Sequence, residues 1–197
     1  MLNGLANVNI ELSSRCSKKC WMCGRRKIEK DYPELAKWGD MDYELVKSIA
    51  GQLPEGIVCQ FHDNGEPLLY PRLGEALALF KNQIRCLDTN GKLLMEKADE
   101  IIGNLDTITV SIIERDTESR EQLDVLTEFN HYKNKRSPLI IGRFLGNVDP
   151  EPYRGLVDIV VKRQLHHPMG SFQYQHEPTI PEIGICQDFL HHLAIKR

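Results

Sequence analysis

The sequence lacks the long apolar segments that a membrane-spanning helix needs. No run in its 197 residues approaches the roughly 18 consecutive apolar residues of such a helix. Its first residues, MLNGLANVNIE, also lack the basic and apolar regions of a secretion signal. We therefore expect a soluble, cytoplasmic protein with no membrane partner.

An excess of charge of one sign is absent as well. The 25 basic and 28 acidic residues give a net charge of −3, which offers no strong field for binding nucleic acid. Glycine and proline are few, at 14 and 10 residues, which excludes collagen-like and low-complexity chains. The 41% hydrophobic and 27% charged residues are typical of a folded chain. The length favours one domain, or one domain with a fragment of a second.

Six cysteines are distributed unevenly along the chain. The absence of a secretion signal, and a length sufficient for a hydrophobic core, argue against a disulfide framework. Cys59 and Cys86 each lie inside a short apolar run, and we predict that both are buried free thiols. Cys16, Cys20 and Cys23 instead fall within the eight residues CSKKCWMC.

Three thiolates this close together can bind one metal centre. A structural zinc site normally takes four ligands, and no second CxxC or HxxxH motif supplies the remainder. A 4Fe–4S cluster on three cysteines would keep one iron open to another ligand. The residues alone leave two hypotheses: an open cluster, or a non-catalytic zinc or iron–sulfur module completed by an external or distant ligand such as Cys186.

Strand-like and helix-like segments alternate along the rest of the chain. Apolar runs and period-two patterns predict strands that begin near residues 7, 57, 84, 107, 138 and 158. This alternation indicates an α/β fold with parallel strands and right-handed crossovers. An open doubly wound sheet and a barrel both fit the pattern, and both bind ligands at the carboxyl ends of the strands. The cysteine segment follows the first strand and falls at that edge.

Apolar residues at helical spacing predict the connecting helices. The first is predicted to begin at about Asp40, its N-cap, with an inward face of Met41, Leu45, Ile49 and Leu53. Others are predicted around residues 71–80, 94–105, 123–129 and 153–156. The basic run Arg25, Arg26 and Lys27, beside the cysteines, is interpreted as a solvated loop.

The CxxxCxxC spacing of Cys16, Cys20 and Cys23 resembles the signature of the radical S-adenosylmethionine superfamily. The resemblance implies a partial (β/α)6 barrel of parallel strands, with a 4Fe–4S cluster on these three cysteines. In that family the open iron binds S-adenosylmethionine, and an electron cleaves it to methionine and a 5′-deoxyadenosyl radical. Where the family usually has an aromatic residue, Met22 stands as an apolar cover for the cluster, and Trp21 precedes it.

The segment DNGEPLL, after the second strand, resembles the GGEP motif of the same family. The resemblance implies that Gly65, Glu66 and Pro67 bind the methionine end of the cofactor, where a carboxylate such as Glu66 accepts from the ammonium group. Asn64 stands in place of the first glycine of the motif. An NGEP sequence is also a good strand-to-helix turn without any cofactor.

Three further residues complete the implied cofactor site. Ser111 matches a polar position on the fourth strand, with its usual acidic neighbour absent or displaced to Glu114 or Asp116. Asn90 ends the third strand. Arg143, on the fifth strand, would be costly among apolar residues unless its charge is paired. We expect it to face the barrel interior and an anion, either the cofactor's carboxylate or a structural Asp or Glu.

Residues 164–197 break the strand–helix alternation and form a short irregular C-terminal extension. Cys186 and the strand-like residues after it resemble the start of a SPASM or twitch extension, which binds auxiliary clusters. No cysteine follows Cys186, so these residues cannot complete such a site. The His pairs at 166–167 and 191–192 would point to opposite faces of a strand, which favours surface and core positions over metal binding.

The resemblance therefore implies an enzyme core over residues 1–163 and an extension over 164–197. Its cofactors would be a 4Fe–4S cluster and S-adenosylmethionine, with no catalytic side chain beyond the cluster. A reductant protein such as flavodoxin or ferredoxin is the implied partner. The substrate would be a peptide, a protein or a small molecule that loses a hydrogen atom, and the acidic charge balance argues against a nucleic acid.

Overall fold

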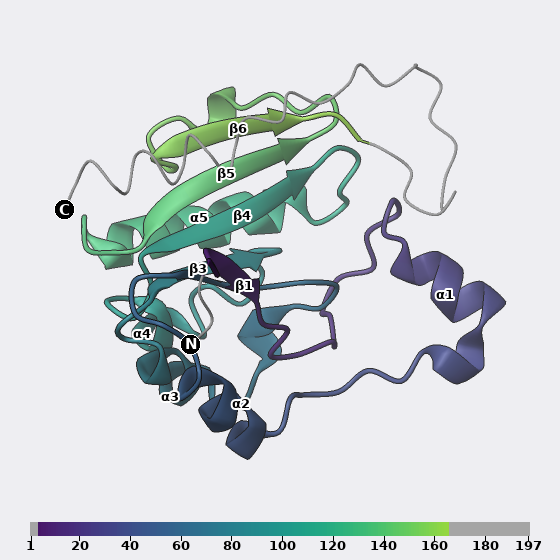
Figure 1. Ribbon diagram of the computed structural model, residues 1–197. Helices are drawn as coiled ribbons and strands as arrows, with labels where there is room; N and C mark the ends of the chain where they lie inside the picture. Colours follow the sequence, from purple (N-terminus) through teal and green to yellow (C-terminus); the bar gives the residue numbers. More distant parts are fainter. Residues whose placement is uncertain (1–3, 166–197) are drawn as a thin grey trace.

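The computed structural model describes residues 4–165, and at its centre is a parallel β-sheet (Figure 1). The strands are β1 (Asn7–Asn9), β2 (Val58–Phe61), β3 (Ile84–Thr89), β4 (Thr107–Ile113), β5 (Leu139–Leu145) and β6 (Ile159–Arg163). All neighbouring pairs are parallel. The predicted α/β class is confirmed, and each strand begins within one residue of its predicted start.

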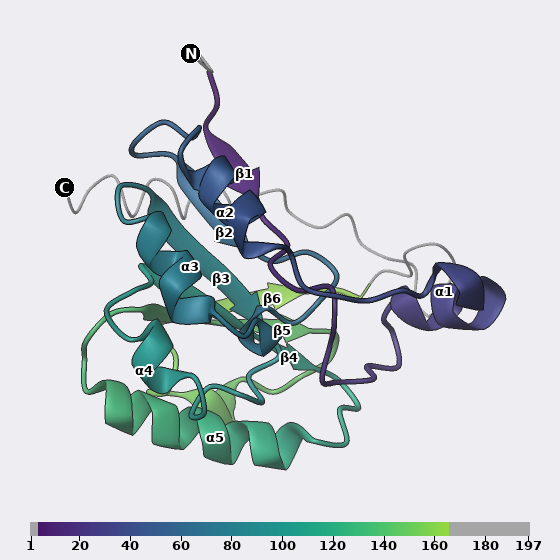
Figure 2. The ribbon, with the colours of Figure 1, turned by 90° about the horizontal axis from the view of Figure 1, so that it is seen from below.

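The strand order decides between the two architectures that the sequence leaves open. A doubly wound sheet reverses its order at one point, which places helices on both faces. Here the order β1-β2-β3-β4-β5-β6 follows the chain without reversal, so successive right-handed crossovers place the helices on one face. Figure 2 shows α2, α3, α4 and α5 along one side of the curved sheet. The fold is a partial barrel, as predicted.

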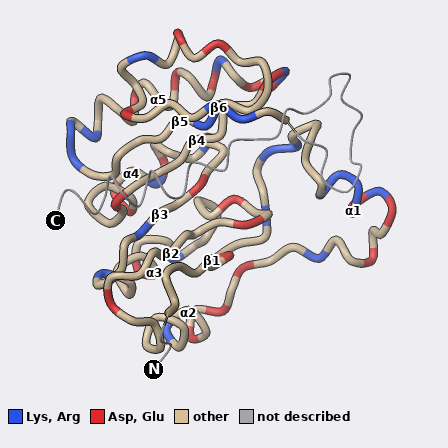
Figure 3. The backbone as a smooth tube through the Cα atoms, turned by 45° about the horizontal axis from the view of Figure 1, so that its top comes forward, with Lys and Arg blue, Asp and Glu red and all other residues tan. Residues whose placement is uncertain are grey.

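The helices between the strands are short, except for α5 with its 15 residues. They are α1 (Arg25–Asp31), α2 (Tyr43–Ala50), α3 (Leu73–Leu79), α4 (Ala98–Ile101) and α5 (Ser119–Lys133), with 3₁₀ helices at Pro33–Leu35, Pro67–Leu69 and Glu151–Tyr153. Helix α1 projects away from the sheet in both views (Figures 1 and 2). The charged residues of both signs are interspersed along the backbone (Figure 3).

The helix predicted from about Asp40 is found as α2, but its cap and its buried face differ from the prediction. The Asp42 carboxylate, not that of Asp40, caps it by accepting from the backbone N–H groups of Glu44 and Leu45 at 2.9 and 3.2 Å. Leu45 is 50% exposed, whereas Val46 is fully buried. Met41, Ile49 and Leu53 pack against the core as predicted, so Leu45 is the one residue of the predicted inward face that lies outside it, and Val46 is buried instead.

Three other segments differ from their predictions. Between residues 94 and 105 only α4 is helical, and Gly103, at a φ of +83°, lies just beyond it. The segment around 153–156 forms the 3₁₀ helix Glu151–Tyr153 instead of an α-helix. The basic run expected to be a solvated loop begins α1, and the Arg25 side chain is buried.

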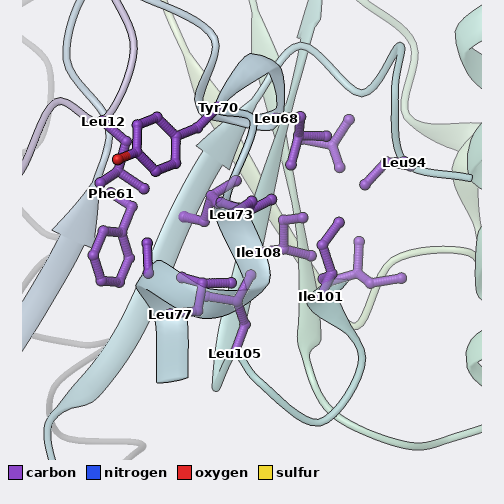
Figure 4. Close-up of a cluster of buried hydrophobic side chains, with 14 of the residues drawn as sticks. Leu12, Phe61, Leu68, Tyr70, Leu73, Leu77, Leu94, Ile101, Leu105 and Ile108 are labelled. Atoms are coloured by element: carbon purple, nitrogen blue, oxygen red, sulfur yellow. The ribbon is translucent and has the colours of Figure 1, made fainter. Parts of the chain in front are cut away.

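A hydrophobic core between the sheet and the helices holds the strands in place (Figure 4). Leu73 and Leu77 of α3 lie in this cluster with Phe61 of β2 and Ile108 of β4. The rings of Phe61 and Phe80 pack edge to face, with centroids 5.1 Å apart. Full burial of each such side chain contributes about 1.5–3 kcal/mol. This layer fixes the strand ends from which the candidate site is built.

Strand β6 ends at Arg163, and the division into a core over residues 1–163 and an extension over 164–197 stays a prediction. The predictions on Cys186 and on the His pairs at 166–167 and 191–192 lie outside the described residues, as does nearly all of the predicted extension. Across residues 4–165, no helix combines the length and the apolar character needed to cross a membrane.

Candidate metal and cofactor site

The cysteine segment follows β1 and lies at the edge of the sheet where the loops after β2, β3 and β4 also emerge. Cys16, Cys20 and Cys23 are half-buried free thiols. Burial raises the pKa of the Cys20 thiol to about 11; Cys16 and Cys23 add to the rise, and Lys18 opposes it. The three sulfurs therefore interact electrostatically, and metal binding would have to displace the Cys20 proton.

The cysteine segment offers three soft sulfur donors, which suit zinc or an iron–sulfur cluster. Among residues 4–165, no three His, Cys, Asp or Glu side chains are arranged to share one metal ion. A zinc site requires every sulfur at about 2.3 Å from the same ion. A 4Fe–4S cluster takes each thiolate on a different iron, so its ligands stand farther apart. Three thiols are the number that a 4Fe–4S cluster with one open iron takes.

Two side chains tie the cysteine segment to the loop after β4. Lys18, 6% exposed, pairs with Asp116 across 2.6 Å. The indole N–H of Trp21 donates to the Glu114 carbonyl at 2.9 Å. A pocket of about 180 Å³ lies between this loop and the segment. Of the two acidic residues suggested as neighbours of Ser111, Asp116 thus pairs with the cysteine segment.

Asn90 reaches the cysteine segment from the end of β3. Its side-chain Nδ2 donates to Ser17 Oγ at 3.2 Å and lies 3.8 Å from Cys16 Sγ. Hydrogen bonds to ligand sulfurs are one of the protein's means of setting the potential of a cluster. The structure therefore brings this sequence-predicted residue to the first cysteine.

The loop Asn64–Pro67, after β2, is held against the chain just before the cysteines. The Glu11 carboxylate accepts from the N–H groups of Asn64 and Gly65 at 2.9 and 3.0 Å. A Cβ atom on Gly65 would lie 1.8 Å from the carbonyl oxygen of Ser13. Glycine is required here because the two backbones approach so closely.

The Glu66 side chain turns into the protein and joins this loop to the end of β3. It is 1% exposed and accepts from Thr89 Oγ1 at 2.7 Å, from the Asn90 N–H at 2.8 Å and from the Leu68 N–H at 3.1 Å. Burial raises the pKa of Glu66, although these hydrogen bonds oppose the rise. Pro67 begins the 3₁₀ helix that follows. In this structure the carboxylate positions the loop.

Ser111 and Arg143 are register partners on β4 and β5. They lie on the face of the sheet opposite the helices, since the next residue along β5, Phe144, is in the core. An Arg143 guanidinium nitrogen is 2.5 Å from Asp88 Oδ2, and His62 Nδ1 is 3.9 Å from the same oxygen. A structural aspartate, one of the two anions that the sequence leaves open for Arg143, thus pairs with it, and the contact with the cofactor's carboxylate stays a prediction.

The remaining sulfur-containing residues divide between the site and the core. Met22 is half-buried in the turn between Cys20 and Cys23. Cys59 and Cys86 are buried thiols that form no disulfide, as predicted. Burial raises the pKa of Cys59 to about 12, and Cys86 adds to the rise. Such a thiol is chemically inert and belongs to the core.

Three residues that hold the site together are not found by sequence reasoning. Glu11 alternates with apolar residues on the first strand and looks like an ordinary solvent-facing position. Lys18 and Arg25 belong to basic runs that are typical of exposed loops, yet both are buried. Their nearness to the cysteines is the one signal that could have drawn attention to them.

Comparison with known proteins places the chain near one curated relative. No family model matches the chain. Over 164 residues it is 28% identical to the tungsten-containing aldehyde ferredoxin oxidoreductase cofactor-modifying protein of Pyrococcus furiosus. The match covers 81% of this chain and 40% of that protein, so the chain spans about 40% of the relative's length.

Two crystal structures of BtrN overlap loosely with the fold. The complex of BtrN with AdoMet and 2-DOIA gives a TM-score of 0.49 at 17% identity. Selenomethionine BtrN in an open conformation gives a TM-score of 0.41 at 22% identity. Each overlap covers 83% of this chain and 58% of the BtrN chain. At these TM-scores the fold assignment rests on the strand order itself.

Proposed function

We propose that this chain is a radical S-adenosylmethionine enzyme that abstracts hydrogen from a substrate. The proposal rests on one observation. Cys16, Cys20 and Cys23 lie half-buried on a loop that the loops after β2, β3 and β4 hold at the carboxyl edge of a parallel partial barrel. Ligands of such sheets bind at that edge. The similarity to a cofactor-modifying protein supports an enzymatic role.

The three cysteines would hold a 4Fe–4S cluster, with Met22 covering it. When bound, the cluster supplies the electron that cleaves S-adenosylmethionine to methionine and a 5′-deoxyadenosyl radical. The chain's own task is to bind and orient the cofactor and to exclude water. Asn90 would donate to the Cys16 sulfur, from which its Nδ2 is 3.8 Å away.

The loop Asn64–Pro67 would bind the methionine end of the cofactor through its main chain. The Glu66 carboxylate already accepts three hydrogen bonds, so its contribution is to hold the loop in place. Ser111 and Arg143 would approach the cofactor from the inner face of β4 and β5. Arg143 would do so as part of an ion pair with Asp88.

A small molecule that serves as another enzyme's cofactor is the substrate class we favour over a peptide. The support for this choice is the relative, which is a cofactor-modifying protein of a tungsten enzyme. A low-potential electron donor such as flavodoxin or ferredoxin is part of the proposal, because reductive cleavage consumes one electron for each turnover.

Anaerobic reconstitution with iron and sulfide tests the proposal. The wild-type chain should take up about four irons and four sulfides, and its reduced form should give an electron paramagnetic resonance signal that changes when S-adenosylmethionine is added. Cys16→Ala, Cys20→Ala and Cys23→Ala should each lose the cluster. Cys59→Ala, which removes a buried thiol of the core, should retain it.

Two results would contradict the proposal. A colourless protein with one zinc per chain would identify a structural metal module. A cluster whose resonance signal does not respond to S-adenosylmethionine would identify a closed iron–sulfur module without an open iron.

A further inference from the structure

Arg25 is a buried cation next to the cysteine segment. It follows Cys23 by two residues and begins α1. Arg25 is 4% exposed, and its Nε atom is buried without a hydrogen-bond partner. Within residues 4–165 no carboxylate forms an ion pair with it. A buried charge without a counter-ion is strongly unfavourable.

The contacts of Arg25 fix its position without neutralising its charge. The guanidinium lies over the ring of Trp38, with Cζ 4.1 Å from the ring centroid. One terminal N–H group donates to the Asn64 carbonyl at 3.1 Å. Because Asn64 begins the loop against which the cofactor would bind, Arg25 links that loop to the cysteine segment.

Other arginines around the site have carboxylate partners. Arg15 pairs with Asp40 across 2.7 Å, and Arg143 pairs with Asp88 across 2.5 Å. Arg26, the next residue in the chain, pairs with Glu29 across 2.7 Å. Arg25 therefore differs from these three arginines in being buried and in having no carboxylate partner among residues 4–165.

We propose that Arg25 is the counter-charge of the iron–sulfur site and raises its reduction potential. This inference rests on the proposed function. Three thiolates leave an oxidised 4Fe–4S cluster net negative, and reduction adds one more electron. A buried cation beside the cluster stabilises the reduced form more than the oxidised form. Arg25 acts through the cluster, so it is a positioning and charge-setting residue, not a catalytic one.

A redox titration of the reconstituted full chain, followed by electron paramagnetic resonance, tests this role. Arg25→Gln should lower the ratio of reduced to oxidised cluster at a fixed potential about tenfold, which is a 59 mV fall for a one-electron couple. Arg25→Lys keeps the charge and should stay close to the wild type. Arg26→Gln, the matched control, removes a charge that Glu29 already neutralises and should shift the ratio much less.

Each outcome of the titration decides the inference. Equal potentials for Arg25→Gln and the wild type, or an equal shift in Arg25→Lys and Arg25→Gln, would overturn it. If Arg25→Gln takes up no cluster, an Arg25→Lys variant that takes up the cluster and has the wild-type potential supports the charge role. If neither variant takes up the cluster, the charge role is overturned, because Arg25 is then needed for the local structure of the site. A wild-type chain that takes up no cluster would overturn the proposed function as well, which distinguishes the two failures.

Discussion

At the scale of the residue, Gly65 determines how closely the cofactor loop approaches the cysteine segment. A Cβ atom at this position would lie 1.8 Å from the Ser13 carbonyl oxygen and 2.7 Å from the Ser14 Cα. Both contacts are with backbone, so no side-chain rotation can relieve them. The loop as a whole would have to move away from the chain that leads into Cys16.

We therefore predict that Gly65→Ala destabilises the protein by about 2–3 kcal/mol, as an overpacked site does, and lowers its iron content after reconstitution. Urea denaturation and iron analysis measure the two effects. Gly39→Ala is the control, because a Cβ there meets nothing within 4 Å; it should change stability by less than about 0.5 kcal/mol. Similar values for the two variants would show that the close approach has no energetic importance.

The sequence identifies residues whose chemistry is evident from local spacing, and it misses those defined by distant partners. The three clustered cysteines belong to the first kind. Lys18 and Glu11 belong to the second, because their partners lie 98 and 53 residues away along the chain. A charged residue looks exposed until the group that neutralises it is known. The pairing of Arg143 with Asp88 could not be predicted from sequence for the same reason.

At the scale of the element, the cysteine segment is held in place by the loop between β4 and α5. The Lys18 and Asp116 side chains are 4% and 12% exposed and lie 2.6 Å apart. Glu118 is a weaker second partner, 3.9 Å from Lys18. Removing the Asp116 charge would leave a buried ammonium without a close counter-ion.

Asp116→Asn should accordingly cost roughly 3 kcal/mol of unfolding free energy, the low end of the range for a broken buried pair, because Glu118 remains. Asp124→Asn is the matched control, since its partner Arg120 is 85% exposed, and it should cost less than about 0.5 kcal/mol. Urea denaturation of the metal-free chain compares the two. An Asp116→Asn variant as stable as the control would show that this ion pair does not hold the segment.

Elements are predicted best where burial imposes a strong periodicity. The strand starts and α5 are predicted from apolar patterns, and the folded protein buries the apolar residues of these patterns. Short helices are predicted less well: α4 has four residues, and α1 forms where a basic run indicated a loop. The order of the strands depends on how the crossovers pack, so only the structure separates a partial barrel from a doubly wound sheet.

At the scale of the whole molecule, the helices cover one face of the sheet and the loops at its carboxyl edge gather the candidate site. Four segments from different parts of the chain meet there: the cysteine segment and the loops after β2, β3 and β4. Each of these loops leaves a strand of the core, and ligands of such sheets bind at this edge. The central claim is that this edge cleaves S-adenosylmethionine.

The most direct test is the formation of 5′-deoxyadenosine by the anaerobically reconstituted chain. We predict that dithionite and S-adenosylmethionine together give 5′-deoxyadenosine and methionine in equal amounts. Omission of dithionite should abolish both products, and Cys20→Ala should form neither. A wild-type chain with a fully loaded 4Fe–4S cluster that forms no 5′-deoxyadenosine under these conditions would contradict the account.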